Sequence, residues 1–188
     1  MTTRCGAAVL AFGLVAWSAA PGAQGGPRPA RTFQPYAGNW VLDEAASTGR
    51  LRTTPRIASS LTIATTPSDI TVTKRLRLGP LDRASATPPP EIYRLDGTET
   101  HAVDERTGVP LDRIFRFTLV ADMLALSMKE PRPGGAGAFT LVTDAYAVDG
   151  DVLTVHRQLS SVTSAGQILV MQDPANNNRH TFVYRRAP

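Results

Sequence analysis

Alternation of apolar and polar residues runs through most of the chain and restricts its fold more than any other feature. Residues 61–74 alternate on both sides of a Pro-Ser-Asp turn, and residues 153–159 alternate after Asp149-Gly150. An Asp-Gly pair between two such runs is a strong hairpin signal, and a second pair stands at Asp96-Gly97. Helical periodicity is hard to find, and residues 42–52 could form one turn at most. Without crossover helices the strands must pair antiparallel, so the sequence predicts an all-β fold.

The connections between the expected strands alternate in length. The long ones are near 44–58, 79–90, 104–110, 130–138 and 160–166, and the tight ones are at 67–68, 96–97, 121–122 and 149–150. In an up-and-down sheet, alternate connections lie at the same end, so hairpins would close one end and longer loops would surround the other. The long segment 173–178 is an exception, since it falls at the hairpin end. We therefore expect an antiparallel up-and-down β-barrel of about 8–10 strands.

The first 23 residues have the layout of a Sec-type signal peptide. Arg4 precedes an apolar run over 7–17, and small residues follow over 18–23. The apolar run is too short for an ordinary membrane span. Cys5 precedes that run, so there is no lipobox, and the mature chain has no cysteine. We expect a secreted or periplasmic protein with a flexible Pro- and Gly-rich lead-in over 24–35 and a barrel domain over 36–188.

Composition excludes several classes of function. The 20 Lys and Arg residues exceed the 16 Asp and Glu residues only slightly and are dispersed among them, whereas a nucleic-acid or membrane surface needs a clustered basic face. His101 with Asp104 and Glu105 does not match a metal-site spacing, and we expect neither a metal nor a cofactor. No nucleophile elbow or phosphate-binding glycine loop is present. The sequence does not show which carboxylates approach one another from distant strands, and an enzyme is the minority interpretation.

The stretch Gly38-Asn39-Trp40 resembles the Gly-x-Trp signature at the first strand of lipocalins. The resemblance implies that the indole plugs the closed end of the barrel and that an arginine near the last strand packs over it. Arg185 and Arg186 are both candidates for this arginine. A buried core aromatic is the alternative role for Trp40, and the two roles are compatible.

A wider resemblance is to lipocalin-like (calycin) exported bacterial proteins. It rests on the ordered set of Gly38–Trp40, Tyr93–Glu99, Tyr146–Val155 and Tyr184–Arg186. Residues 142–146 echo the second lipocalin motif only loosely, and the C-terminal helix usual in lipocalins is not legible. The resemblance implies a barrel that carries a small molecule.

Strand phase predicts which side chains line the barrel. These are Tyr93, Phe115, Phe117, Leu124, Leu126, Met128, Val155 and Phe182, and each is equally a candidate core residue. Lys74 and Arg157 continue two of the apolar faces, late in their strands, so both would lie near the open mouth. There they would either meet the anionic head of an amphipathic ligand or extend outward into solvent.

The expected function is therefore non-catalytic binding of a small apolar or amphipathic molecule, with or without an anionic group. Two alternatives remain open. One is an envelope interaction or structural module with a filled barrel, for which the protein partner is unknown. The other is a hydrolase or isomerase built on the barrel, which would need convergent polar groups with perturbed pKa values.

Overall fold

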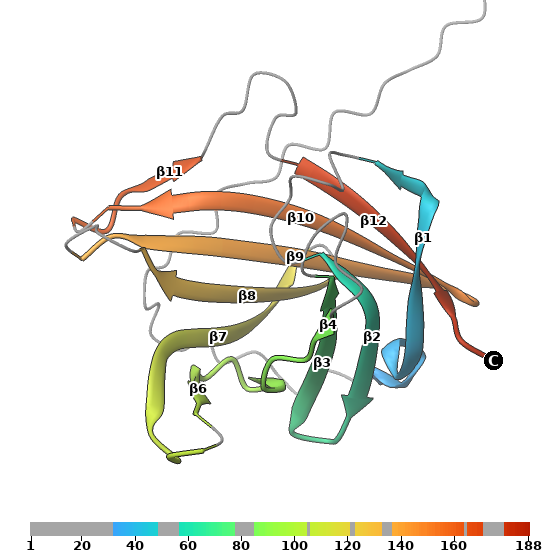
Figure 1. Cartoon of the computed structure of the whole chain (residues 1–188), viewed down its shortest axis with the longest axis horizontal. Coiled ribbons are helices and arrows are strands. Elements are labelled where there is room, and N and C mark those ends of the chain that lie inside the picture. The colour runs from blue at the N-terminus through green and yellow to red at the C-terminus, as the bar shows by residue number, and fades with distance from the viewer. Residues whose placement is uncertain are drawn as a thin grey trace, which may run out of the picture. The chain divides into compact units, whose positions relative to one another are not determined.

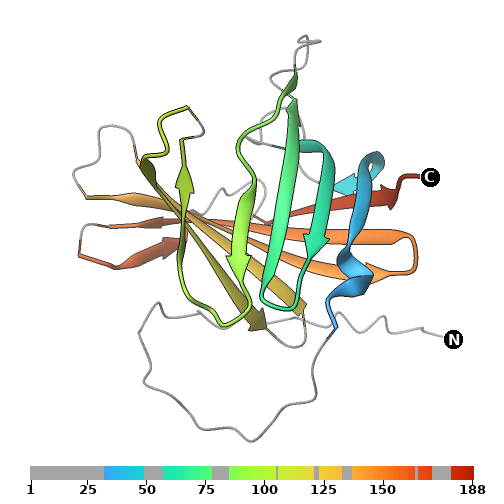
Figure 2. The same ribbon diagram turned by 90° about the horizontal axis from the view of Figure 1, so that it is seen from below.

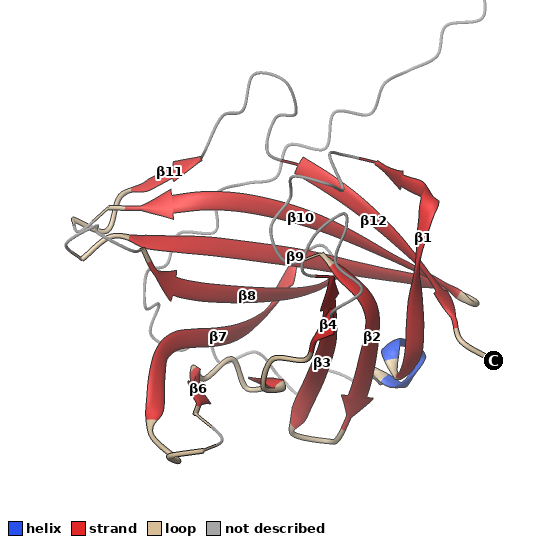
Figure 3. Ribbon diagram, viewed as in Figure 1, coloured by secondary structure: helices blue, strands red, loops and turns tan. Residues whose placement is uncertain are grey.

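The computed structural model describes residues 32–48, 57–77, 85–104, 106–120, 123–132, 137–163, 165–170 and 179–188. Within these ranges the chain forms one short 3₁₀ helix, η1 (Gln34–Tyr36), and twelve strands (Figures 1 and 3). The strands are β1 (Gly38–Thr48), β2 (Ala58–Thr65), β3 (Asp69–Arg77), β4 (Ser85–Ala86), β5 (Glu91–Arg94), β6 (Thr100–Val103), β7 (Pro110–Val120), β8 (Met123–Pro131), β9 (Phe139–Asp149), β10 (Val152–Val162), β11 (Ile168–Val170) and β12 (Arg179–Arg186).

The strands form a single antiparallel sheet that curls into a nearly closed barrel (Figure 2). The path of neighbours is β4-β3-β2-β1-β12-β10-β9-β8-β7-β6, which is ten positions. The other two strands share positions: β5 pairs with β3, as β4 does, and β11 pairs with β10, as β12 does. Because β1 pairs with both β2 and β12, the first and last strands in sequence lie side by side in the barrel wall. The predicted all-β, antiparallel barrel is confirmed.

The hairpins gather at the end of the barrel that holds Trp40. Trp40 pairs with Arg186 at the end of β12, and Val152 at the start of β10 pairs with both Asp149 and Arg185. The β9–β10 turn is therefore Gly150-Asp151, one residue later than the predicted Asp149-Gly150. Gly150 has a φ of 56°, the left-handed conformation that such a turn requires. The expected turn at 121–122 lies outside the described residues.

One expected connection differs from the structure. The turn at Asp96-Gly97 exists, with the amide and hydroxyl of Thr98 bonded to Asp96 Oδ1. However, no ladder among the described residues joins β5 to β6, and this is where the barrel is incomplete. The segment 173–178 lies outside the described residues, so its expected placement at the hairpin end stays a prediction. The flanking strands β11 and β12 both pair with β10.

The possible helical turn after Trp40 is replaced by an irregular part of β1. The pairing of β1 with β12 shifts register between Asp43 and Thr48. Asp43 Oδ1 accepts a hydrogen bond from the Ala46 amide at 3.1 Å, and the Ser47 hydroxyl donates to the Asp43 carbonyl at 2.7 Å. Ser47 Oγ in turn accepts the amide of Val183 in β12. A polar side chain thus keeps the ladder bonded where the strand bulges.

The barrel unit begins at Thr32, within the expected lead-in. The Phe33 ring meets Phe117 edge-on at 5.7 Å between centroids, and the Tyr36 hydroxyl donates to the Tyr146 carbonyl at 3.4 Å. Residues just ahead of β1 therefore pack against the hairpin end of the barrel. The predicted signal peptide lies outside the described residues, and within them no helix is long and apolar enough to cross a membrane.

Candidate functional site

Trp40 is completely buried at the hairpin end of the barrel. Its indole N–H donates to the Tyr36 carbonyl at 2.9 Å, and the guanidinium of Arg186 lies over its ring at 4.3 Å from the centroid. Arg186 also donates to the carbonyls of Ala37 and Pro35 and to Asp151. A single cation thus joins η1, the β9–β10 turn and the indole, and it closes this end.

Of the two candidate arginines, Arg186 packs on the indole and Arg185 does not. Arg185 points outward, is largely exposed, and pairs with Asp43 at 3.1 Å. Gly38 is the first residue of the Gly-x-Trp signature, and the structure shows why a glycine is needed there. It has a φ of 138°, and a Cβ at this position would lie 2.6 Å from Nη1 of Arg186. A side chain there would displace the arginine that covers Trp40.

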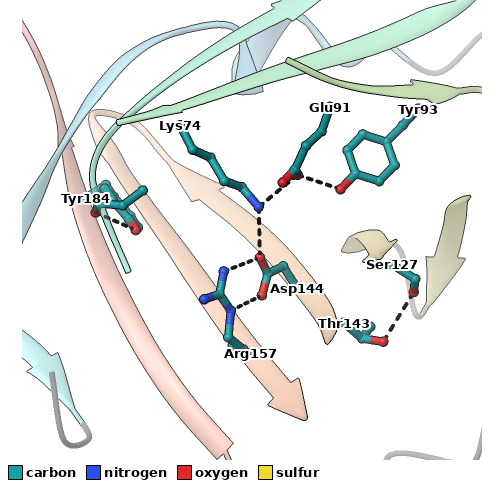
Figure 4. Close-up of polar contacts among 9 residues, drawn as sticks. Lys74, Glu91, Tyr93, Ser127, Thr143, Asp144, Arg157 and Tyr184 are labelled. Atoms are coloured by element: carbon teal, nitrogen blue, oxygen red, sulfur yellow. Dashed lines mark hydrogen bonds and ion pairs between the residues drawn. The ribbon is translucent and has the colours of Figure 1, made fainter. Parts of the chain in front are cut away.

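Inside the barrel, four charged side chains form what we call the interior charge cluster: Lys74, Glu91, Asp144 and Arg157 (Figure 4). Lys74 Nζ lies 2.8 Å from Glu91 Oε2 and 3.8 Å from Asp144 Oδ2. Glu91 pairs with Val72 in the β3–β5 ladder, so it stands one inward position from Lys74 on the neighbouring strand. Lys74 therefore connects the β3–β5 wall with the β9–β10 wall.

Asp144 and Arg157 face each other directly across the β9–β10 ladder. Arg157 Nε donates to Oδ1 and Nη2 donates to Oδ2, both at 2.7 Å, so the pair is bidentate. Asp144 is 3% exposed and Arg157 is 7% exposed. The guanidinium also lies 5.4 Å from the centroid of the Phe182 ring, which contributes an apolar face beside the ion pair.

The pair fixes the ionisation of both partners. Burial alone would raise the pKa of Asp144, but the charge and hydrogen bonds of Arg157 outweigh burial and hold that pKa below its usual range. Burial would lower the pKa of Arg157, and Asp144 instead raises it. Near neutral pH, Asp144 is therefore a carboxylate and Arg157 is a cation, as a hydrogen-bonded buried pair requires.

Three buried tyrosines accompany the cluster. The Tyr93 hydroxyl donates to Glu91 Oε2 at 2.7 Å, and the Tyr184 hydroxyl donates to the Ala58 carbonyl at 3.2 Å (Figure 4). Burial raises the pKa of the Tyr93, Tyr146 and Tyr184 hydroxyls. For Tyr146, the negative charges of Asp144 and Glu91 raise the pKa further, and its side chain shares the inward face of β9 with Asp144.

The eight predicted apolar lining residues are all buried inside the barrel, together with Lys74 and Arg157. They are Tyr93, Phe115, Phe117, Leu124, Leu126, Met128, Val155 and Phe182. Their role in binding a ligand stays a prediction. Of the two roles expected for Lys74 and Arg157, extension outward into solvent is wrong, because both side chains are buried. Strand phase gives the face of a side chain and not the partners it meets. Both cations are turned inward and paired with carboxylates.

Sequence reasoning missed Glu91, Asp144 and Tyr146. Phase could have found them, because Glu91 precedes Tyr93 by two residues, as Asp144 precedes Tyr146, and residues two apart share a face. Asp144 was instead considered only within the loose motif over 142–146. That each carboxylate meets a cation depends on strand neighbours far away in sequence.

The three histidines lie on β6, β10 and β12. Across the described ranges, no group of three or more His, Cys, Asp and Glu could hold a metal ion. His101 is exposed, and its expected companion Asp104 instead accepts the amides of Arg106 and Thr107. His156 faces outward beside Thr181, and His180 stacks on Phe182.

An open pocket of about 940 Å³ lies on the outside of the barrel, beside the break between β5 and β6. Its lining includes Ile92, Arg94, Asp96, Glu99 and His101. These residues are separate from the interior charge cluster, so the pocket and the cluster are distinct features.

The fold and its interior define a nearly closed antiparallel β-barrel with buried polar groups in an otherwise apolar interior. Among solved structures, it is similar to a variant of the fluorescent protein UnaG, with a TM-score of 0.47 and 14% identity over 84% of this chain and 99% of that chain. No protein-family model matches the sequence, and no curated protein matches it.

Proposed function

We propose that the protein is a non-catalytic binding protein that holds a small apolar or amphipathic molecule inside its barrel. The observation that carries this proposal is the interior charge cluster, which stands among apolar side chains such as Phe115, Val155 and Phe182. Replacing a buried ion pair by apolar residues of similar volume is often neutral or stabilising. Four charges inside a barrel are therefore poorly explained by stability, whereas a few placed polar groups in an apolar surround are typical of ligand sites.

The ligand enters from the end opposite Trp40. The hairpin end is filled by the indole, by Arg186 and by the segment Phe33–Tyr36 packed against the strands. Entry from the opposite end places the polar groups of the cluster ahead of an arriving molecule and the apolar lining around it.

Binding is favoured over catalysis because the Asp144–Arg157 pair and the buried tyrosines do not offer a group ready to exchange a proton. A general acid or base works best with a pKa near the working pH. Asp144 is held ionised, Arg157 is held protonated, and the pKa values of the three buried tyrosines lie above their ordinary range. These shifts all move the groups away from neutrality.

The proposed location is secreted or periplasmic, and it is supported by the leader pattern of residues 1–23. Expression of the full chain should yield a mature protein that begins near residue 24. Subcellular fractionation with N-terminal sequencing tests this, and an intact chain that stays in the cytoplasm would contradict it.

The binding function is tested by extracting the purified protein with organic solvent and analysing the extract by mass spectrometry. Nile red, an uncharged apolar dye, is then titrated into the protein in a Trp17→Phe background, in which Trp40 is the only tryptophan. We expect saturable dye fluorescence and quenching of Trp40 emission. A protein that yields no extract, binds no dye, and shows no thermal shift with apolar compounds would contradict the proposal.

A matched pair of variants places the ligand inside or outside the wall. Val155 is buried on the inner face of β10, and Thr154 beside it faces the other side. Val155→Trp should weaken dye binding by about tenfold or more, since the added ring occupies space in the barrel, while Thr154→Trp should leave it unchanged. Circular dichroism and urea unfolding check that both variants fold. Equal binding by two folded variants would place the dye outside the barrel.

A further inference from the structure

The formal charges of the interior charge cluster cancel. Lys74 and Arg157 contribute two positive charges, and Glu91 and Asp144 contribute two negative ones, with the principal contacts at 2.7–2.8 Å. Each cation is already matched by a carboxylate on a neighbouring strand. The cluster therefore differs from a binding site in which a buried cation awaits an anionic ligand.

This balance restricts the polar end of any ligand that reaches the cluster. A carboxylate or an ammonium group would either leave one uncompensated charge in the interior or separate an existing pair, and both are strongly unfavourable for groups this deeply buried. An uncharged polar group changes neither the net charge nor the pairing. It needs only a hydrogen-bonding partner that the cluster has not already engaged.

Tyr146 supplies such a partner. It lies on β9, two residues from Asp144 and on the same inward face, and it is 1% exposed. The hydroxyls of Tyr93 and Tyr184 are committed to Glu91 and to the Ala58 carbonyl. The backbone of Tyr146 belongs to the ladders with β8 and β10, and its carbonyl also accepts from Tyr36. Within the described part of the chain, its hydroxyl makes no hydrogen bond. Its hydroxyl is thus an available donor and acceptor beside the cluster.

We propose that the ligand carries an uncharged hydrogen-bonding end, such as an alcohol, ketone or amide, which bonds to the Tyr146 hydroxyl while the cluster stays paired. This inference rests on the proposed binding function and names the chemistry of its ligand. The cluster contributes selectivity because it admits a neutral polar group and penalises a charged one of either sign. The apolar remainder of the ligand packs against the lining residues.

The test is a series of ligands with one chain and four heads: dodecan-1-ol, dodecanamide, dodecanoate and dodecylammonium, each competing with Nile red at pH 7.5 on the full protein. The alcohol and the amide should bind at least about tenfold more tightly than the two ions, because an unmatched buried charge is worth several kcal/mol. Dodecanoate or dodecylammonium binding as tightly as the alcohol would overturn the inference and leave the binding function standing. Failure of the whole series to displace bound dye would also overturn the inference, whereas failure of the dye itself to bind would overturn the proposed function.

A matched pair of tyrosine variants tests the contact. Tyr146→Phe should weaken the alcohol by about 2- to 10-fold, the loss expected for one neutral hydrogen bond, once the competition is corrected for the dye affinity measured separately for each variant. Tyr184→Phe removes an identical hydroxyl that is bonded to Ala58, so it should leave the head-group preference as it is. Equal effects of the two variants on the alcohol would overturn the role of Tyr146.

A charge variant tests the balance directly. Glu91→Gln keeps the shape of the side chain and gives the cluster a net positive charge, while Lys74 stays 3.8 Å from Asp144. The preference between dodecanoate and dodecan-1-ol should move about tenfold toward the anion. Glu44→Gln, on the exposed part of β1, removes the same charge far from the cluster and should not change it. An unchanged preference in folded Glu91→Gln would show that charge balance does not select the ligand.

Discussion

Breaking the Asp144–Arg157 pair from one side should destabilise the protein far more than removing both partners. Asp144→Leu leaves Arg157 buried without the carboxylate that accepts two of its donors at 2.7 Å. Charge-assisted hydrogen bonds contribute about 1.5–3 kcal/mol each, and loss of one member of a buried pair typically costs about 3–5 kcal/mol. We therefore expect a loss of about 3–5 kcal/mol in the free energy of unfolding. Arg157→Met should give a similar loss.

The double variant Asp144→Leu/Arg157→Met leaves no unmatched charge at this position, since Lys74 keeps Glu91 at 2.8 Å. It should be within about 1 kcal/mol of the wild type, which makes the coupling energy of the cycle several kcal/mol. Urea unfolding followed by Trp40 emission measures this. With a urea slope of about 2 kcal/mol/M, each single variant should move the midpoint by about 2 M.

Arg185→Leu is the control for the cycle, because it breaks an exposed pair with Asp43. It should change stability by no more than about 1 kcal/mol. The reasoning is refuted if Asp144→Leu falls within that same range, or if the double variant loses the sum of the two single losses. Either result would mean that the pair is not desolvated as the geometry indicates.

Gly38→Ala should lower stability by about 1–3 kcal/mol in thermal unfolding, because the backbone has a φ of 138° and the new Cβ would displace Arg186 from Trp40; Gly166→Ala, with a positive φ but open space around it, measures the backbone part alone. Burial raises the pKa of Tyr93, Tyr146 and Tyr184, so stability should be constant below about pH 10 and fall as the pH rises above it; phenolate absorbance that appears before the chain unfolds would contradict this. Asp144 has a lowered pKa, so its contribution is present above about pH 3.9 and is lost as the pH falls through its folded value; the double variant should lack this component of the acid unfolding curve. Trp40 is fully buried, so in a Trp17→Phe background its emission should be blue-shifted and resist acrylamide, and Arg186→Leu should raise its quenching more than Arg185→Leu does.

The fold was accessible from the sequence because its signals are local. Alternation along residues 153–159 and the Asp-Gly pairs depend on neighbours in the chain, and they predicted an antiparallel barrel with a buried Trp40. Features that depend on partners far away in the sequence could not be predicted. The choice between Arg185 and Arg186 follows from which side of β12 faces the indole, and the pairing of β11 and β12 along the same edge of β10 has no local signature.

For the same reason, only the two cations of the interior charge cluster could be predicted from the sequence. Charge on an apolar face singled out Lys74 and Arg157, because one sequence run is enough to show the anomaly. Their carboxylates come from other strands, and Asp144 meets Lys74 only because the β3–β5 and β9–β10 walls approach within the barrel. With the strand register known, each of the two cations would be expected to pair with a carboxylate inside the barrel.

The contact of β1 with β12 also has a consequence for how the molecule comes into being. Trp40 lies in the first strand of the sheet, and the arginine that covers it lies in β12. A nascent fragment that lacks β12 has an open wall and an uncovered indole, so the core closes only when β12 is available. Pairings this distant in sequence also make folding slow. During synthesis, the barrel therefore stays incomplete until β12 has emerged.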